Sequence, residues 1–212
     1  MKEESVENLE IKLVDSVTSE NLVELSADLG ESFIDVVMDD GVAQNIPILG
    51  TLYKLGKVGL GIRDQYFAKK VFNFLINIKD ISTHDRLKFI ADLENHDFKQ
   101  RAGETLITLL DRFDNSEKPV ILSNLLRARV ENHIDIVNFL RLASIIEKAF
   151  LPDLKSLHEY RTSNLYKGHE CESLRSLGLI YQSVIDANGE NNRFSITSLG
   201  QDILDYGLKN YA

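Results

Sequence analysis

The fold class is decided by three stretches of the chain: STHDRLKFIADL at residues 82–93, SEKPVILSNLLRARV at 116–130 and DIVNFLRLASIIEKAF at 135–150. In each stretch, apolar residues recur every three or four positions, the period of an α-helix with one buried face. Ser82 and Asp85 resemble a capping box, and Pro119 suits the first turn of a helix, where its missing N–H costs nothing. A further helix is predicted over 98–113, and the short polar turns indicate antiparallel neighbours in a helical bundle.

The residues before this region extend the helical pattern. From Ser19, a suitable N-cap, apolar spacing predicts one helix over 19–39. A second amphipathic stretch covers 48–78, as one long helix or as a broken pair, with glycines at positions 50, 56, 59 and 61. Each such glycine costs about 1 kcal/mol against alanine, so we expect a close helix contact, a kink or a change of conformation there. Residues 1–18 are acidic and weakly periodic, which predicts a loosely docked arm.

The last sixty residues change character. Short helices are predicted over 153–160 and 170–177, and Gly178 ends the second. Two apolar stretches around the polar turn 186–192 predict one β-hairpin, and a final helix begins at Ser198. The predicted organisation is therefore a polar arm (1–18), a helical body (19–150) and a carboxy-terminal module (151–212).

This carboxy-terminal module resembles winged-helix proteins. The sequence LRSLGLI at 174–180, the polar turn, and RFSITSLG at 193–200 resemble the end of the recognition helix, the wing and the start of the closing helix in that family. The resemblance implies a mainly α protein, a helical bundle followed by a winged-helix-like module with one small β-hairpin. It also implies a partner-binding face, which here comprises His169, Glu170, Glu172, Arg175 and Arg193.

The charge of that face argues against nucleic acid as the partner. DNA-binding members of the family carry basic side chains on the recognition helix and the wing. Here Glu170 and Glu172 lie on the predicted helix, and Asp186 and Glu190 lie in the predicted wing. Phosphates would repel this surface, so the module is predicted to dock on protein.

The same carboxy-terminal pattern behind a helical body is similar to the abortive-infection alpha group of small bacterial proteins. Some members of that group are encoded among phage-defence genes. The resemblance implies a role in bacterial phage defence.

Composition and motifs favour an interaction protein over an enzyme. The 212 residues include one cysteine, Cys171, which excludes an internal disulfide, and the first residues lack the features of a secretion signal, which predicts a cytoplasmic protein. The five histidines lack the spacing that fixes two metal ligands on one helix, and no phosphate-binding loop follows a strand. We therefore predict no catalytic residues, no metal site and no cofactor.

Charge is distributed unevenly along the chain, whose formal net charge is −9. Residues 1–45 carry 12 acidic and 2 basic side chains, whereas residues 46–80 carry 6 basic and 2 acidic ones. The two segments either neutralise each other within the fold or present faces to different partners.

The basic segment holds a candidate membrane or partner face. It comprises Leu52, Lys54, Leu55, Lys57, Ile62 and Arg63. Each lysine would cost about 2.5–3.5 kcal/mol at the centre of a bilayer, which argues against a transmembrane helix. Peripheral contact with a membrane surface stays open, because lysines can meet anionic headgroups while leucines dip inward.

The sequence therefore predicts a non-enzymatic macromolecular interaction protein with a protein partner. Two alternatives stay open. One is a membrane-acting defence or toxicity effector that uses the amphipathic stretch 48–78, and the other is a winged-helix regulator that binds DNA.

Overall fold

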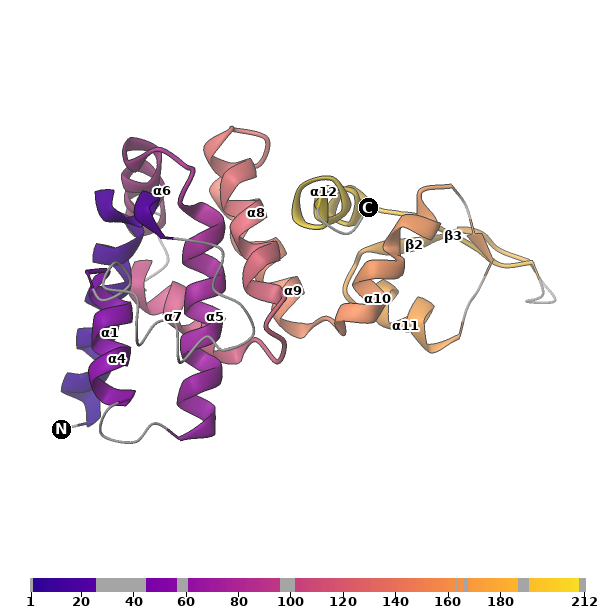
Figure 1. Ribbon diagram of the computed structural model, residues 1–212. Helices are drawn as coiled ribbons and strands as arrows, with labels where there is room; N and C mark the ends of the chain where they lie inside the picture. Colours follow the sequence, from indigo (N-terminus) through magenta and orange to yellow (C-terminus); the bar gives the residue numbers. More distant parts are fainter. Residues whose placement is uncertain are drawn as a thin grey trace. The chain divides into compact units, whose positions relative to one another are not determined.

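The computed structural model describes residues 2–25, 45–56, 61–95, 102–162, 164–165, 168–186 and 191–209. These residues form a mainly α-helical protein with a small three-stranded antiparallel sheet (Figure 1), which confirms the predicted fold class. The chain divides into two compact units, Met1–Ile136 and Val137–Ala212. We predicted the boundary at 150, but only Ala149 and Phe150 separate the helices on either side of that position, so the chain has no linker there.

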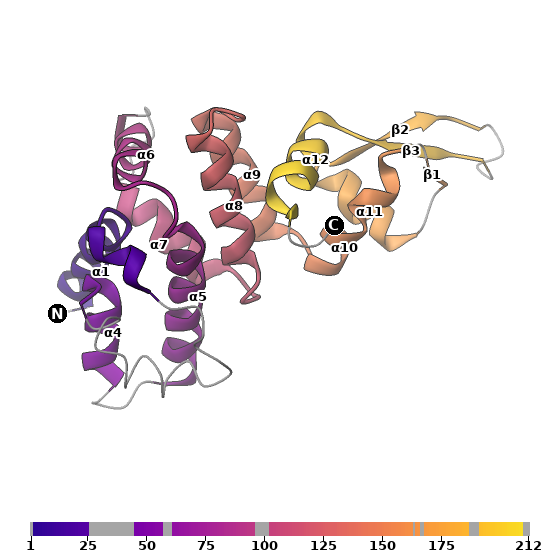
Figure 2. The same ribbon diagram turned by 45° about the horizontal axis from the view of Figure 1, so that its top comes forward.

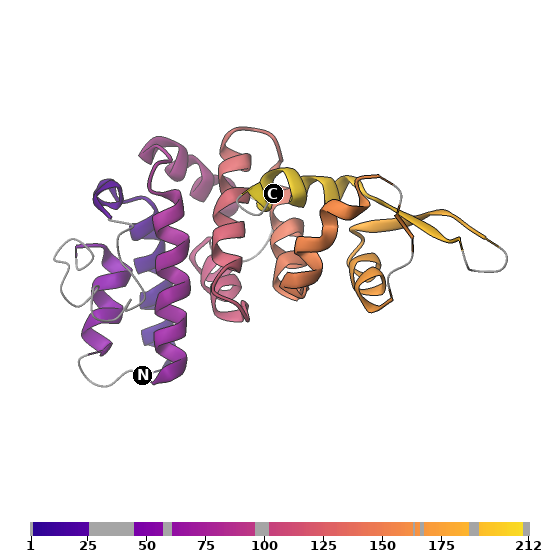
Figure 3. The same ribbon diagram turned by 45° about the vertical axis from the view of Figure 1, so that its right-hand side comes forward.

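The first unit is a helical bundle (Figures 1 and 3). Its described elements are α1 (Lys2–Val17), η1 (Glu20–Glu24), α4 (Pro47–Gly56), α5 (Ile62–Ile78), α6 (Thr83–Asn95), α7 (Ala102–Arg112) and α8 (Lys118–Val130). The long helix α5 packs against α8 and α7, and α1 packs against α4 and α7. Of the two predictions for 48–78, the structure shows the broken pair, α4 and α5.

Two predicted helix starts are confirmed. Pro119 lies in the first turn of α8. At the start of α6, Ser82 Oγ accepts a hydrogen bond from the N–H of Asp85 at 3.1 Å. The Ser82 hydroxyl also donates to the Asp85 carboxylate at 2.6 Å, so the two side chains hold the turn together from both directions.

The amino-terminal segment is a packed helix, and the prediction of a loosely docked arm is wrong. Leu13 and Val17 of α1 are fully buried. Ser16 Oγ accepts a hydrogen bond from the N–H of Ile48 at 2.9 Å. Because the first N–H groups of a helix lack partners within it, Ser16 caps α4 from the neighbouring helix. The prediction gave too much weight to acidic composition and too little to the spacing of the buried residues.

Ser19 is an N-cap, as predicted, but the helix that it starts is short. Its Oγ accepts a hydrogen bond from the N–H of Asn21 at 3.2 Å, and η1 ends at Glu24 because Leu25 is extended. The predicted helix over 19–39 is therefore wrong at Leu25, and its later part lies outside the described residues. The Leu25 carbonyl accepts a hydrogen bond from Lys79 Nζ at 2.8 Å, a tertiary contact that takes the place of a helical one.

Buried cations join the segments of this unit. The fully buried Arg86 donates hydrogen bonds to the carbonyl oxygens of Ser19, at 2.7 Å, of Lys79, at 3.2 Å, and of Ile81. Lys70 Nζ donates to two carbonyls at the end of α7, those of Asp111 at 2.7 Å and Phe113 at 2.9 Å. The last carbonyls of a helix lack intrahelical partners, so Lys70 of α5 supplies hydrogen bonds to carbonyls at the end of α7. Burial lowers the pKa of both cations.

The close crossing of α1 and α7 depends on Gly103. A Cβ atom at this position would lie 2.6 Å from the carbonyl oxygen of Glu10, far inside van der Waals contact. The missing side chain therefore lets the two helix backbones touch.

The second unit combines short helices with the sheet. Its described elements are α9 (Ile136–Lys148), α10 (Leu151–Ser156), η2 (Leu157–Tyr160), β1 (Asn164–Leu165), α11 (His169–Ser176), β2 (Ile180–Val184), β3 (Arg193–Ile196), α12 (Ser198–Asp202) and the π-helix η3 (Ile203–Gly207). The strand order is β1-β3-β2, all antiparallel (Figure 2). The predicted pairing of the two hairpin strands is confirmed, and its turn residues 187–190 lie outside the described part. The two-residue strand β1 was not predicted, because so short a segment has no periodicity to detect.

Two short sequence patterns of this unit, Leu177-Gly178 and Thr197-x-x-Gly200, have a structural reason. Gly178 has φ +73°, a left-handed conformation that ends α11. Thr197 Oγ1 accepts a hydrogen bond from the N–H of Gly200 at 3.1 Å and donates to the Gly178 carbonyl at 2.7 Å. A Cβ at Gly200 would lie 2.2 Å from the carbonyl oxygen of Leu179. The threonine thus ties the start of α12 to the end of α11, and the glycine makes room for that contact.

We predict that Gly103→Ala destabilises the first unit. Alanine normally favours an exposed helix interior by about 1 kcal/mol over glycine, whereas overpacking costs about 1–3 kcal/mol. The clash with Glu10 should outweigh the gain in helix propensity and lower the midpoint of urea unfolding. Gly61→Ala is the matched control, because its Cβ would meet its nearest neighbour at an ordinary 3.5 Å. A Gly103→Ala variant as stable as the wild type would show that the helices do not touch here.

Candidate functional site

A cleft of about 280 Å³ lies on the first unit. It is lined by Glu10, Ile11, Val14 and Asp15 of α1, by Glu94 near the end of α6 and by Gly103 of α7. The α1 residues lie along one side of the helix because Glu10 and Val14, and likewise Ile11 and Asp15, are four positions apart. The α7 backbone forms the other wall, which Gly103 allows to lie close.

The cleft is acidic and partly apolar. Three carboxylates, those of Glu10, Asp15 and Glu94, surround it, and none forms an ion pair with a described residue. Ile11 keeps 53% of its surface exposed. Carboxylates that no described cation neutralises, beside an exposed aliphatic side chain, favour the binding of a group that is positively charged at its end and apolar along its length.

The unpaired carboxylates also bear on how the chain's charge is distributed. Within the described ranges, no ion pair joins a carboxylate of residues 1–45 to a cation of residues 46–80. Arg63 of the basic segment instead pairs with Asp111 of α7 at 3.2 Å. Both possibilities left open by the sequence therefore remain predictions, because only Glu10, Asp15, Glu20 and Glu24 of the acidic segment have described side chains.

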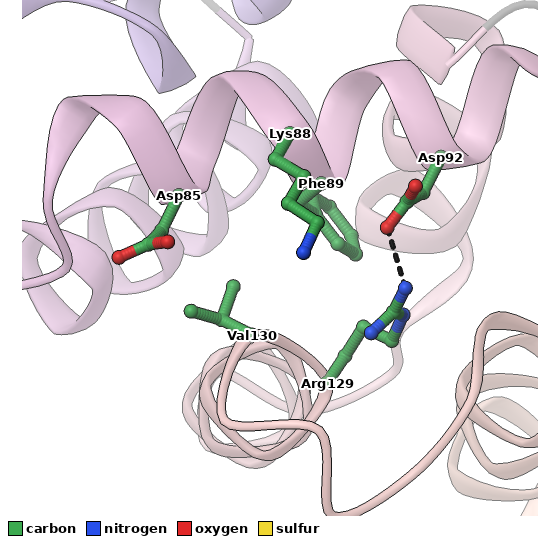
Figure 4. A pocket seen from close by; sticks show the side chains of 6 residues that line it. All are labelled: Asp85, Lys88, Phe89, Asp92, Arg129 and Val130. Atoms are coloured by element: carbon green, nitrogen blue, oxygen red, sulfur yellow. Dashed lines mark hydrogen bonds and ion pairs between the residues drawn. The ribbon is translucent and has the colours of Figure 1, made fainter.

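A second, much smaller hollow lies between α6 and α8 (Figure 4). Arg129 of α8 forms an ion pair with Asp92 of α6 at 2.6 Å, and Figure 4 shows the Lys88 amine between Asp85 and Asp92. The buried Nε of Arg129 has no hydrogen-bond partner in the described part of the chain. The hollow measures about 10 Å³, room for about one water molecule. The Asp92–Arg129 ion pair joins α6 to α8, and the space beside it is too small for a substrate.

The predicted membrane or partner face on 52–63 is not one surface. Leu52 is 5% exposed and belongs to the core, whereas Ile62 is 75% exposed on the next helix. Lys54 and Arg63 are exposed, but the side chain of Leu55 and all of Lys57 lie outside the described residues. The prediction continued one helical face across 57–60, whereas α4 ends at Gly56 and α5 begins at Ile62.

The predicted partner face on the carboxy-terminal module is likewise divided. His169, Glu172 and Arg175 are exposed on α11, as expected. Glu170 is half-buried and accepts a hydrogen bond from the Tyr160 hydroxyl at 3.2 Å, and burial together with this carboxylate raises the pKa of Tyr160. Arg193 lies on β3, and no hydrogen bond or ion pair in the described structure joins its side chain to the α11 residues.

Neither a metal site nor a membrane span is found in the described ranges. No group of three or more histidine, cysteine, aspartate or glutamate side chains is placed there to hold a metal ion. No helix in those ranges has both the length and the hydropathy that crossing a bilayer requires. Cys171 is buried in α11.

Comparisons of the chain with protein-family models, with curated proteins and with solved structures each find no match. The function is therefore inferred from the surfaces described above.

We predict that Leu52→Ala lowers the free energy of unfolding by about 2–4 kcal/mol, because it leaves a cavity in the core. Ile62→Ala should change that free energy by less than about 0.5 kcal/mol, because the side chain is exposed. Chemical denaturation of both variants checks the difference. Equal losses would mean that the two residues share one environment, as the sequence-based prediction assumed.

We also predict that Asp202→Asn stabilises the second unit at neutral pH. Burial, and next the charge of Asp205, raise the pKa of Asp202 above its ordinary value of 3.8. Ionised Asp202 therefore costs the folded state stability at neutral pH, and this cost disappears as the pH falls through the raised pKa. The advantage of the variant in thermal unfolding should be present at pH 7 and shrink towards pH 4. Asp205→Asn, which removes an ion pair with Arg161 at 2.5 Å, should show no such advantage.

Proposed function

We propose that this protein is a non-enzymatic interaction protein and that the cleft between α1 and α7 binds a basic, partly apolar segment of a protein partner. One observation carries the proposal: three carboxylates without a described ion pair surround a cleft whose wall includes the exposed Ile11. An isolated pair of surface charges gains little free energy, but several like charges around one hollow create an electric field that attracts an oppositely charged group.

The size of the cleft indicates what enters it. Sites for whole small molecules commonly measure about 300–1,000 Å³ and are mostly enclosed. At about 280 Å³, this cleft suits one or two long side chains of a larger partner. A lysine or arginine fits, because its aliphatic stem can lie along Ile11 and Val14 while its charged end reaches the carboxylates of Glu10 and Glu94.

The other two hypotheses from the sequence have no comparable support. The membrane-effector hypothesis requires the 48–78 stretch to leave the core when triggered, because Leu52 is buried in the folded chain. The DNA-regulator hypothesis needs a basic face, and on α11 the acidic Glu172 stands among the exposed residues with Arg175. The phage-defence role implied by resemblance would be the setting of the proposed interaction, and plating efficiency of phage on cells with and without this protein tests it.

A charge-reversal experiment tests the cleft. The probe is a fluorescein-labelled, 14-residue helical peptide of lysine, leucine and alanine with its lysines on one face, titrated by fluorescence anisotropy. We predict that the wild-type chain binds it more weakly as salt rises from 50 to 200 mM, because salt screens the attraction. The double variant Glu10→Lys/Glu94→Lys should bind at least about tenfold more weakly, which corresponds to about 1.4 kcal/mol.

The matched control is Glu20→Lys/Glu24→Lys, which changes the net charge equally but acts on η1, outside the cleft. This control should keep most of the affinity, and circular dichroism should show all variants folded. If both double variants lose affinity equally, binding of the peptide depends only on the overall charge of the protein, and the cleft is not the binding site. Vesicles of phosphatidylglycerol and phosphatidylcholine form a separate arm, in which co-sedimentation of the wild type at 200 mM salt would favour the membrane hypothesis.

A further inference from the structure

The outer face of the small sheet in the second unit combines exposed apolar side chains with Arg193 and Ser195. In antiparallel pairs, directly opposite residues lie on the same face. Arg193 of β3 is opposite Leu165 of β1 and, across a register shift between Gln182 and Val184, opposite Val184 of β2. Two positions along β3, Ser195 is opposite Tyr181. Phe194, which alternates with Arg193, is buried, so the Arg193 row faces outward.

The apolar members of this face are exposed to an unusual degree for large side chains. Leu165 is 45% exposed, Val184 is 45% exposed and Tyr181 is 52% exposed. The adjoining Ile185 is also exposed. Single exposed apolar residues are common on protein surfaces, but a contiguous group of them marks an interaction site.

Arg193 lies in the middle of this group, and no described residue supplies a counter-charge for it. Its side chain is exposed and forms no ion pair or hydrogen bond with a described residue. Its two cross-strand neighbours, Leu165 and Val184, are aliphatic, so no carboxylate competes for it on its own row. Arginine and tyrosine framed by apolar side chains are the residues that dominate the energy of protein interfaces.

The charge of this face decides between possible occupants. Two copies of the chain pairing by this face about a two-fold axis would bring Arg193 towards its own symmetry mate, and like charges repel. A nucleic acid would need several cations, and among its described residues this face has one, Arg193. A protein segment that presents carboxylates between apolar side chains complements both features of the face.

We propose that the outer sheet face formed by Leu165, Tyr181, Val184 and Arg193 binds an acidic, apolar segment of a protein partner. A carboxylate of the segment accepts two hydrogen bonds from the Arg193 guanidinium, and neighbouring aliphatic or aromatic side chains cover Leu165, Val184 and the Tyr181 ring. This face binds a ligand whose charge is opposite to that of the ligand proposed for the α1–α7 cleft. The two sites lie on different units, so either proposal can fail without the other.

The test uses the full-length chain and two labelled peptides. The acidic peptide alternates three glutamates with leucine and phenylalanine, and the neutral peptide has glutamine in place of each glutamate. Wild-type protein should bind the acidic peptide at least fivefold more tightly in fluorescence anisotropy. Arg193→Gln should remove this preference, and Tyr181→Ala should weaken the binding of both peptides.

Arg175→Gln is the matched control, because it removes an equally exposed arginine from α11. It should preserve the preference for the acidic peptide, and Arg193→Lys should restore part of it. Any one of three results would overturn the proposal: equal binding of the two peptides by the wild type, equal losses in Arg193→Gln and Arg175→Gln, or no detectable binding of the acidic peptide at millimolar concentration.

Discussion

The first unit depends on one buried guanidinium, that of Arg86. Its nitrogens donate to carbonyl oxygens from three places, the start of η1, the end of α5 and the turn before α6. A buried charge is costly unless it is hydrogen-bonded, so the surrounding backbone must adopt the conformation that supplies those carbonyls to the two terminal nitrogens, while the buried Nε has no partner in the described part of the chain. Lys70 and Lys79 do the same for the end of α7 and for Leu25. These cations fix where helices end, and thereby where α1, α6 and α7 meet around the cleft.

The cations that donate hydrogen bonds to helix ends do not form ion pairs with the described carboxylates of α1. Cations of the segment 46–80 bind backbone carbonyls or carboxylates of α7, and the carboxylates of Glu10 and Asp15 on α1 keep no described counter-charge. Among the described residues, Lys70 and Arg63 contact α7, and Lys79 contacts Leu25, and none of the three pairs with Glu10 or Asp15. The proposed cleft for a basic segment and the proposed sheet face for an acidic one would give the chain two docking surfaces of opposite sign.

The sequence predicted helices best where capping residues and apolar spacing agreed, as for Ser82 and Pro119. It failed for α1, because acidic composition outweighed the spacing of Leu13 and Val17, and it overextended the helix after Ser19, because the competing contact from Lys79 comes from a distant segment. The candidate faces failed for a related reason. A helical pattern on 48–78 cannot show that the helix is interrupted, and the distance between Arg193 and α11 along the chain does not show which face of the sheet the arginine occupies.

By itself, the sequence determined the mainly α class, most helix positions in 82–150 and the pairing of the hairpin strands, since spacing, caps and turn residues act over a few positions. Only the tertiary structure decided that α1 packs through Leu13 and Val17, that Leu52 is buried and that Glu10, Asp15 and Glu94 surround one cleft. These outcomes depend on contacts between segments far apart in the chain, such as the contact between Gly103 and the backbone of Glu10. Local periodicity contains no information about which distant backbone atoms a side chain will meet.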